Sequence, residues 1–371
     1  MTKSADKKLR VLVVDDSAYM CKVLNEIINA DPQLEVAGQA RDGRDAVALA
    51  ESLRPDVITM DINMPHVDGL QATELIMSQN PRPIVIVSSE SREGASTTLR
   101  ALELGAIDFV PKPSSGVDLD MKKVGEELTR KLKMAAKVRV VRTATRSKLP
   151  EPHPPVPVSS SYASASAIAA QNGGKFPIVV IAASTGGPAA VMRVVAGLPK
   201  DFPGAIFLVL HMPAAFTKQF TVQLAEIAPL PVKEAESNEA TQPGVIYLCP
   251  GSHHMRLSST GKILLDAGPR IDGYRPCADV AFESVAAYAR GFAVGVVLTG
   301  MSNDGAKGVK AIKAAAGYVI AQDEASSVIF GMPAEAIKTG VVNEVLSLET
   351  ISAAIEKRVA KLARLVPVEA R

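Results

Sequence analysis

Short apolar runs rich in Val and Ile alternate with amphipathic segments in two separate parts of the chain. In the first part, the pattern predicts strands at residues 10–14, 35–40, 57–60, 84–87 and 107–110. Amphipathic helices are expected between them, with a last helix at residues 121–137. Alternating strands and helices are typical of α/β folds, in which helices cover both faces of a parallel sheet. We therefore expect a doubly wound parallel-sheet domain in residues 1–137.

The second part, from residue 176 to residue 371, repeats this pattern. Residues 178–181, 205–210 and 294–298 are continuous apolar runs, as expected for strands that are covered on both faces. Residues 245–248, 255–257 and 262–265 are short runs separated by turn residues, which predicts an inserted β-hairpin or meander. We expect a second doubly wound domain, Rossmann-like, with this hairpin inserted.

Residues 138–175 differ in composition from both parts. They include RSKLPEPHPPVPVSSSYASASAIAAQNGG, which is rich in Pro, Ser and Ala and has no sustained apolar period. Pro-rich chain is extended and semi-rigid, whereas Ser/Gly-rich chain is flexible. We predict an interdomain linker here; an ordered surface extension is the alternative.

Composition excludes several classes of function. The aromatic share is 4% with no Trp, and the formal net charge is +2, which argues against a nucleic-acid partner. Three widely spaced cysteines, without a CxxC pair, favour a reducing compartment. The polar N-terminus is unlike a signal peptide, and the apolar runs are far shorter than the roughly 20 residues that span a bilayer. We expect a cytoplasmic protein with no direct membrane insertion.

Acidic residues follow two predicted strands of the first part. Asp15 and Asp16 come directly after the first strand, and Asp61 comes directly after the third. Ligands of open parallel sheets bind outside the carboxyl ends of strands, where the strand order reverses. Converging carboxylates repel one another, and oxygen ligands at such a site suit Mg²⁺. The spacing therefore predicts a magnesium site.

Two further polar side chains follow strands of the same part. Ser88 ends the fourth strand, and Lys112 follows the fifth. Each acid singly could cap a helix, Ser88 could be a turn residue, and Lys112 could be a solvated loop charge. Together, a cation, a carboxylate, a hydroxyl and an ammonium form a site that accepts a phosphoryl group.

Residues 8–137 resemble the response-regulator receiver family through VVDDS, DINMPHVDGL, IVSS and VPKP. The resemblance implies a flavodoxin-like fold with Asp61 as the phospho-acceptor. It implies Mg²⁺ ligands from Asp15, Asp16, Asp61 and the backbone carbonyl of Asn63. The hydroxyl and ammonium described above would contact the phosphoryl oxygens, and Phe109 stands where the family often has a switching aromatic.

Three side chains suited to acyl transfer follow three strands of the second part. Ser184 lies on a sharp strand-to-helix turn in AASTGGP, His211 ends AIFLVLHMP, and Asp304 opens a helix in LTGMSNDGAKG. Singly, the glycine turn could cradle phosphate, although it lacks GxGxxG spacing and a Walker lysine, and the other two could be structural. Their common position at strand ends predicts a serine nucleophile, a histidine base and an orienting aspartate.

Other candidate residues carry weaker signals. His253 and His254 are adjacent and lack an evident third ligand, so a zinc site is disfavoured. Arg275 could hold an anionic substrate or fix a neighbouring loop. The alternative of a different class is a receiver-linked, non-catalytic adaptor; a DNA-binding output domain is disfavoured by the lack of a basic recognition helix.

Residues 177–345 are similar to the protein-glutamate methylesterase family of chemotaxis regulators through AASTGGP, HMP, YLCPGSHHMRL, RPCADVAFESVA, LTGMSNDGAKG and GMPAEAI. The resemblance implies a phosphorylation-activated serine hydrolase that removes methyl esters from chemoreceptor glutamates, releases methanol and deamidates specific receptor glutamines. It implies a histidine kinase as phosphodonor and no cofactor for hydrolysis.

The same resemblance implies oxyanion donors and shows one departure from the family. The implied donors are Thr185 and the backbone N–H of Met301. The usual GMGxDG reads GMSNDG here, with Ser302 in place of Gly, so we expect an altered rate rather than lost activity.

Overall fold

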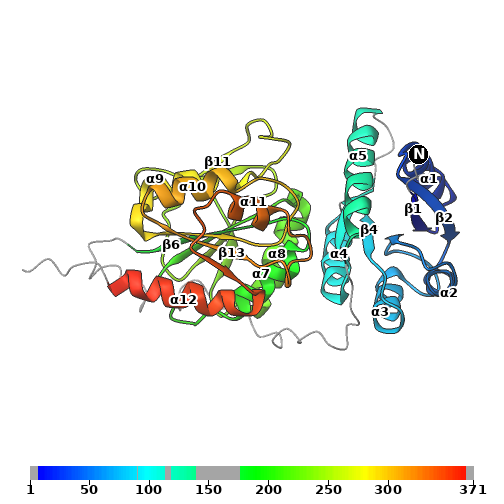
Figure 1. Ribbon diagram of the computed structural model, residues 1–371, viewed down its shortest axis with the longest axis horizontal. Helices are drawn as coiled ribbons and strands as arrows, with labels where there is room; N and C mark the ends of the chain where they lie inside the picture. The colour runs from blue at the N-terminus through cyan, green and yellow to red at the C-terminus, as the bar shows by residue number, and fades with distance from the viewer. Residues whose placement is uncertain (1–6, 90, 113–117, 139–175, 365–371) are drawn as a thin grey trace, which may run out of the picture. The chain divides into compact units, whose positions relative to one another are not determined.

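The computed structural model describes residues 7–89, 91–112, 118–138 and 176–364 (Figure 1). They belong to two compact units, divided between Ser147 and Lys148. The linker predicted at residues 138–175 lies outside the described residues from position 139 onward, so its domain boundaries stay a prediction. In the described part of the chain, no helix is both long and apolar enough to cross a membrane.

The first unit alternates strands and helices as predicted. Its elements are β1 (Leu9–Val14), α1 (Ala18–Ala30), β2 (Leu34–Ala40), α2 (Gly43–Leu53), β3 (Val57–Met60), α3 (Gly69–Gln79), β4 (Ile84–Ser88), α4 (Arg92–Leu104), β5 (Asp108–Pro111) and α5 (Asp118–Ala135). The parallel sheet has the order β2-β1-β3-β4-β5, so the strand order reverses between β1 and β3. Helices α1 and α5 pack together, as do α2, α3 and α4. This order confirms the flavodoxin-like expectation.

The second unit is also a parallel α/β structure. Its elements up to the hairpin are β6 (Ile178–Ala183), α7 (Gly187–Ala196), β7 (Ala205–Leu210), α8 (Ala214–Ile227), β8 (Val232–Glu234), β9 (Ile246–Leu248), β10 (His254–Leu257) and β11 (Ile263–Asp266). The remaining elements are α9 (Ala278–Ala289), the short 3-10 helix Arg290–Phe292, β12 (Ala293–Val297), α10 (Ala306–Ala314), β13 (Tyr318–Gln322), α11 (Met332–Lys338), β14 (Glu344–Leu346) and α12 (Leu348–Arg364).

The parallel sheet of the second unit has the order β14-β13-β12-β6-β7-β9-β8. Figure 1 shows α9 and α10 on one face of the sheet and α7 and α12 on the other. Strands β6, β7 and β12 are buried along their whole length, as their apolar runs predict. The order reverses between β6 and β12, which places a switch point at their carboxyl ends.

The inserted hairpin is confirmed, with one correction. Strands β10 and β11 pair antiparallel, with Met255 opposite Leu265. The run at residues 245–248 does not extend this hairpin into a meander, because β9 pairs parallel with β7 and β8 in the main sheet. Tyr247 of β9 is fully buried and meets Phe207 of β7 edge to face at 5.7 Å, and this packing favours the sheet position.

Candidate functional site

Ser184 and His211 directly follow two neighbouring strands in the parallel sheet of the second unit. Strands β6 and β7 pair in parallel, with Ala183 opposite Leu210. Ser184 is the next residue after Ala183, and His211 is the next after Leu210. The backbone N–H of His211 donates to the carbonyl of Ala183 at 3.3 Å. Ser184 donates its own backbone N–H to the carbonyl of Thr299 at 3.0 Å, which ties the turn to the segment after β12. The switch point therefore brings three strand ends together.

The turn after Ser184 depends on glycine. Gly186 caps α7 with a φ of +73°, in the left-handed region that glycine adopts without strain. A Cβ at this position would also lie 2.6 Å from Cβ of Val328. Pro188 at the start of α7 fixes the direction of the helix. Backbone sterics thus place the serine at the rim of the sheet.

Asp304 binds the imidazole and is held by backbone amides. Its Oδ2 lies 2.7 Å from Nε2 of His211, and the Asp304 side chain is nearly buried. It also accepts hydrogen bonds from the amides of Ala278 at 2.6 Å and Asp279 at 2.9 Å, and from Sγ of Cys277 at 3.2 Å. Burial alone would raise the pKa of Asp304, but the hydrogen bonds from His211 and these amides hold that pKa below its ordinary value. Asp304 therefore acts as a carboxylate acceptor.

In the predicted triad, the side chains of Ser184 and His211 are not joined by a hydrogen bond. Within the described residues, Oγ of Ser184 makes no hydrogen bond, and Nδ1 of His211 is buried without a hydrogen-bond partner. With Nε2 engaged by Asp304, Nδ1 is the ring nitrogen left to accept a proton. Catalytic hydrogen bonds often tighten only when substrate binds. The structure thus joins His211 to Asp304 and places Ser184 on the neighbouring strand end.

The segment after β12 lies against the serine. A Cβ at Gly300 would come 2.9 Å from Cβ of Ser184, so glycine permits this close approach. The carbonyl of Thr185 accepts a hydrogen bond from Oγ1 of Thr299 at 3.0 Å. The amide of Met301 donates no hydrogen bond to the part of the chain that the structure describes. This free N–H next to Ser184 is compatible with the predicted oxyanion role.

Ser302 has a local structural contact. Its Oγ accepts a hydrogen bond from the backbone N–H of Asp304 at 3.1 Å. The hydroxyl therefore closes a small turn directly before the aspartate. A glycine here could not make this bond, so Ser302 adds a contact that helps to hold Asp304.

The other predicted candidates have structural partners. His254 is buried, with Nε2 at 3.0 Å from the carbonyl of Pro269 and Nδ1 accepting from the amide of Cys277 at 3.2 Å. Nδ1 of His253 lies 2.8 Å from Oγ of Ser252. Arg275 donates to the carbonyls of Ala267 and Gly268, both at 2.8 Å, so it fixes the neighbouring loop.

Sequence reasoning missed Tyr274, Cys277 and Asp279. Tyr274 stacks on His211, Cys277 bonds Asp304, and Asp279 accepts a hydrogen bond from the amide of Gly308 at 2.6 Å. All three belong to the motif GYRPCAD, and this shared motif is the sequence signal that could have identified them.

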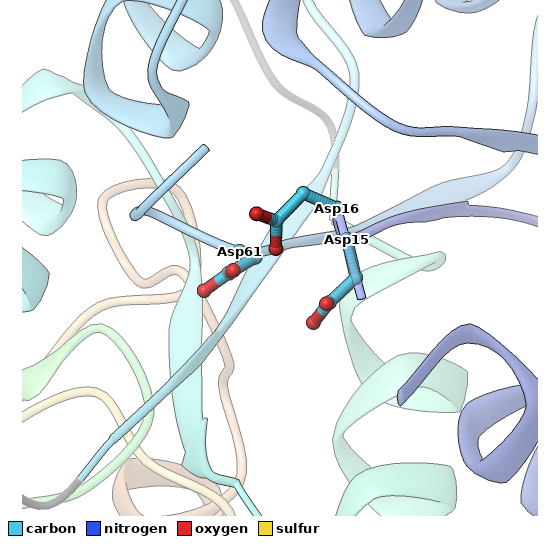
Figure 2. Close-up of side chains that lie close together, drawn as sticks. All are labelled: Asp15, Asp16 and Asp61. Carbon is cyan, nitrogen blue, oxygen red and sulfur yellow. The ribbon is translucent and has the colours of Figure 1, made fainter. Parts of the chain in front are cut away.

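The first unit brings its three predicted acids together (Figure 2). Figure 2 shows that the side chains of Asp15, Asp16 and Asp61 lie close together. One carboxyl oxygen of each lies within 4.8 Å of the others. Asp15 and Asp61 are buried, whereas Asp16 is exposed. The amide of Asp61 donates to the carbonyl of Val14 at 2.9 Å, which places the ends of β1 and β3 in contact. This is the only such group of acids, histidines and cysteines found among the described residues.

Lys112 lies at the same sheet edge and contacts two of the acids. Its Nζ is 2.8 Å from Oδ2 of Asp15 and 2.8 Å from Oδ2 of Asp61. Burial raises the pKa of Asp61 and the charge of Asp15 adds to this, while Lys112 opposes it. Burial would lower the pKa of Lys112, but the two carboxylates outweigh it and raise that pKa. The charged groups of this cluster therefore shift one another's pKa values.

The remaining predicted residues of this sheet edge differ in burial and in their contacts. Ser88 is buried, its carbonyl accepts the amide of Lys112 at 2.7 Å, and its Oγ lies 3.4 Å from the carbonyl of Gly94. Asn63 is exposed beyond Asp61. Phe109 is buried, with Nζ of Lys131 lying 5.2 Å from its ring centroid.

Two family models match the chain: CheB methylesterase over residues 179–355 and response regulator receiver domain over residues 11–124. A protein-glutamate methylesterase/protein-glutamine glutaminase of Pyrococcus horikoshii is 43% identical over 357 residues, covering 95% of this chain and 94% of that protein. Its counterpart in Symbiobacterium thermophilum is 41% identical, covering 97% and 99%. The solved catalytic domain of Thermotoga maritima CheB methylesterase is 38% identical and covers 49% of this chain and 98% of that one, with a TM-score of 0.48.

Proposed function

We propose a mechanism from the premise that this chain belongs to the protein-glutamate methylesterase family and carries a response-regulator receiver domain. It is accordingly a hydrolase of protein glutamate methyl esters with protein-glutamine glutaminase activity, and its receiver places it under control by phosphorylation in chemotaxis adaptation. The roles of individual residues, which follow, are our proposal.

In the proposed acylation step, Oγ of Ser184 bonds to the ester carbonyl carbon while its proton passes to Nδ1 of His211. The carbonyl oxygen becomes an oxyanion that accepts hydrogen bonds from Thr185 and from the amide of Met301. The carbon–oxygen bond to the methoxy group then breaks, and methanol leaves with the proton from His211. Asp304 holds the imidazole and stabilises its cation.

In the deacylation step, water replaces methanol. His211 takes a proton from the water as the water oxygen bonds to the acyl carbon. The bond between this carbon and Oγ of Ser184 then breaks, Oγ takes the proton from His211, and the glutamate carboxyl group is released. Hydrolysis of a glutamine side chain follows the same course, with ammonia as the leaving group. The observation that carries this proposal is the 2.7 Å contact between His211 and Asp304 at the rim where Ser184 emerges.

Replacement of Ser184 tests the assignment. Ser184→Ala removes the nucleophile, so we expect loss of methanol release from methylated receptor membranes, while phosphate uptake by the receiver is unchanged. Lys218→Ala, on α8 and outside both sites, serves as the control. Esterase activity at the wild-type level in the serine variant would contradict the proposal.

We also propose that Asp61 is the phosphoryl acceptor. Its carboxylate oxygen bonds to phosphorus as the donor's phosphorus–nitrogen or phosphorus–oxygen bond breaks. Lys112, already 2.8 Å from this carboxylate, moves to a phosphoryl oxygen, and Ser88 donates its hydroxyl to another. We propose a histidine kinase of the chemotaxis pathway as the donor and methylated chemoreceptors as the substrates.

The oxygen donors at this edge fit a divalent cation. Asp15, Asp16, Asp61 and the backbone carbonyl of Asn63 are hard ligands, and their crowded charges are otherwise balanced only in part by Lys112. When bound, Mg²⁺ supplies positive charge that reduces repulsion between the acids and an incoming phosphoryl group. We expect phosphate uptake to require it.

A further inference from the structure

The ring of Tyr274 lies flat against the imidazole of His211. The ring centroids are 4.0 Å apart and the planes differ by 18°. Tyr274 belongs to the segment between β11 and α9, and no step of the mechanism above uses it. Its own position is fixed, because Ile271 and Tyr274 exchange two backbone hydrogen bonds of 3.0 and 2.9 Å. The turn between them has positive φ at Asp272 and Gly273, as a tight two-residue turn requires.

The hydroxyl of Tyr274 reaches a second part of the site. It donates a hydrogen bond to the carbonyl of Met301 at 3.3 Å. Met301 follows Gly300, which lies against Ser184. One side chain thus contacts both the proposed base and the segment that carries the proposed oxyanion donor.

We propose that Tyr274 is a positioning residue of the hydrolase, and that its ring fixes the direction in which Nδ1 of His211 points. The imidazole has one ring hydrogen bond among the described residues, that to Asp304. A single hydrogen bond holds one edge of a ring and leaves tilt about that contact free. A flat aromatic neighbour at van der Waals distance blocks this tilt.

The same contact stabilises the positive charge that forms on the base during the proposed proton transfer. When Nδ1 takes the serine proton, the imidazole becomes a cation facing the ring of Tyr274. The negative face of an aromatic ring attracts a cation at this distance. This inference rests on the proposed role of His211 as the base.

Two substitutions separate the ring from the hydroxyl. Tyr274→Phe keeps the stacked ring and loses the hydrogen bond to Met301, whereas Tyr274→Leu loses the ring. We expect kcat for methanol release to fall about 2- to 30-fold in the leucine variant with KM unchanged, the range that corresponds to one cation–π contact. We expect the phenylalanine variant to restore kcat to within about 3-fold of wild type. Tyr288→Leu on α9, 37% exposed, is the matched control and should match wild type.

A spectroscopic measurement tests the stacking without relying on turnover. In protein labelled with ¹³C-histidine, the ring protons of His211, assigned as those missing in His211→Gln, should be shifted upfield in wild type and in Tyr274→Phe. This measurement stands even when the leucine variant does not fold. Absence of the upfield shift in wild type would overturn the inference.

The kinetic outcomes distinguish this inference from the proposed function. Full activity in His211→Gln would show that His211 is not the base, and this would overturn the proposed function itself. If His211→Gln is inactive and Tyr274→Leu retains wild-type kcat, only the positioning role is overturned. A change in KM alone in the leucine variant, or equal losses in the leucine and phenylalanine variants, would also overturn it.

Discussion

Asp304 and Asp279 are both nearly buried, yet their surroundings shift their pKa values in opposite directions. Asp304 receives hydrogen bonds from His211 and from two backbone amides, which hold its pKa below the ordinary value. Burial raises the pKa of Asp279 to about 6, against backbone donors such as Gly308, and the charge of Asp304 adds to the rise. Asp304 therefore remains a carboxylate under conditions where Asp279 takes up a proton.

The raised pKa of Asp279 predicts a pH-dependent stability. The folded state holds this proton more tightly than the unfolded state, so the free energy of unfolding falls as pH rises from about 4 to about 6. Asp279→Asn keeps an oxygen acceptor for Gly308 but has no proton to lose. We expect its unfolding free energy, measured in urea at pH 4 and pH 7, to lack this fall, a difference on the order of 2 kcal/mol.

The comparison isolates one group because the remaining carboxylates are the same in both proteins, and the pKa of the neighbouring Asp304 stays below its ordinary value. Glu283→Gln on the same helix provides the control for removal of a nearby charge. Parallel pH dependence in wild type and Asp279→Asn would contradict the assignment of this proton to Asp279.

At the scale of elements, α9 and α10 cap each other through these two aspartates. The side chain of Asp304, which lies just before α10, accepts hydrogen bonds from the first amides of α9. The side chain of Asp279, in the first turn of α9, accepts one from the amide of Gly308 in the first turn of α10. Carboxylates are stabilised at helix N-termini. The position of the aspartate that binds His211 is thereby set by two helices.

The turn that begins α7 gives a prediction at the same scale. Gly186→Ala should lower both Tm and kcat. Alanine is strained at a φ of +73°, and its Cβ would lie 2.6 Å from Cβ of Val328. Strain of this kind costs on the order of 1–3 kcal/mol. Measurement of thermal unfolding and methanol release checks both effects.

Gly340→Ala is the matched control for this turn. Gly340 has a φ of +74°, close to that of Gly186, but a Cβ there meets nothing within 4 Å. This variant should therefore show the backbone strain alone and retain kcat. Equal losses of activity in both variants would show that contact with Val328 does not hold the serine turn.

At the scale of the whole molecule, the two units share one arrangement of sheet and polar residues. Each is a parallel sheet whose strand order reverses once, and each gathers its polar residues at the carboxyl ends beside that reversal. The first gathers acids and a lysine, and the second gathers a serine, a histidine and an aspartate. Phosphorylation of one unit and hydrolysis in the other are thus separate chemistries that the chain couples.

This coupling predicts the effect of removing the phosphoryl acceptor. Asp61→Asn should abolish stimulation of methanol release by a small-molecule phosphodonor with Mg²⁺, while basal hydrolysis remains. A coupling free energy of 1–3 kcal/mol corresponds to about 5- to 150-fold stimulation in wild type. Glu51→Gln, on the exposed side of α2, should respond like wild type; full stimulation in Asp61→Asn would place the acceptor elsewhere.

Local apolar pattern predicted most of the strands, their alternation with helices and the residues that follow those strands. These properties are local, because apolar periodicity and glycine turns act within a few residues, and parallel strands must end at a common edge. It therefore predicted Asp15, Asp61 and Lys112 at one edge, and His211 with Asp304 at another. Four features depend on tertiary packing: Nε2 faces Asp304, amides of α9 hold this carboxylate, Tyr274 covers the imidazole, and β9 joins the main sheet. Those contacts join segments far apart along the chain, and side-chain packing rather than local pattern selects among them.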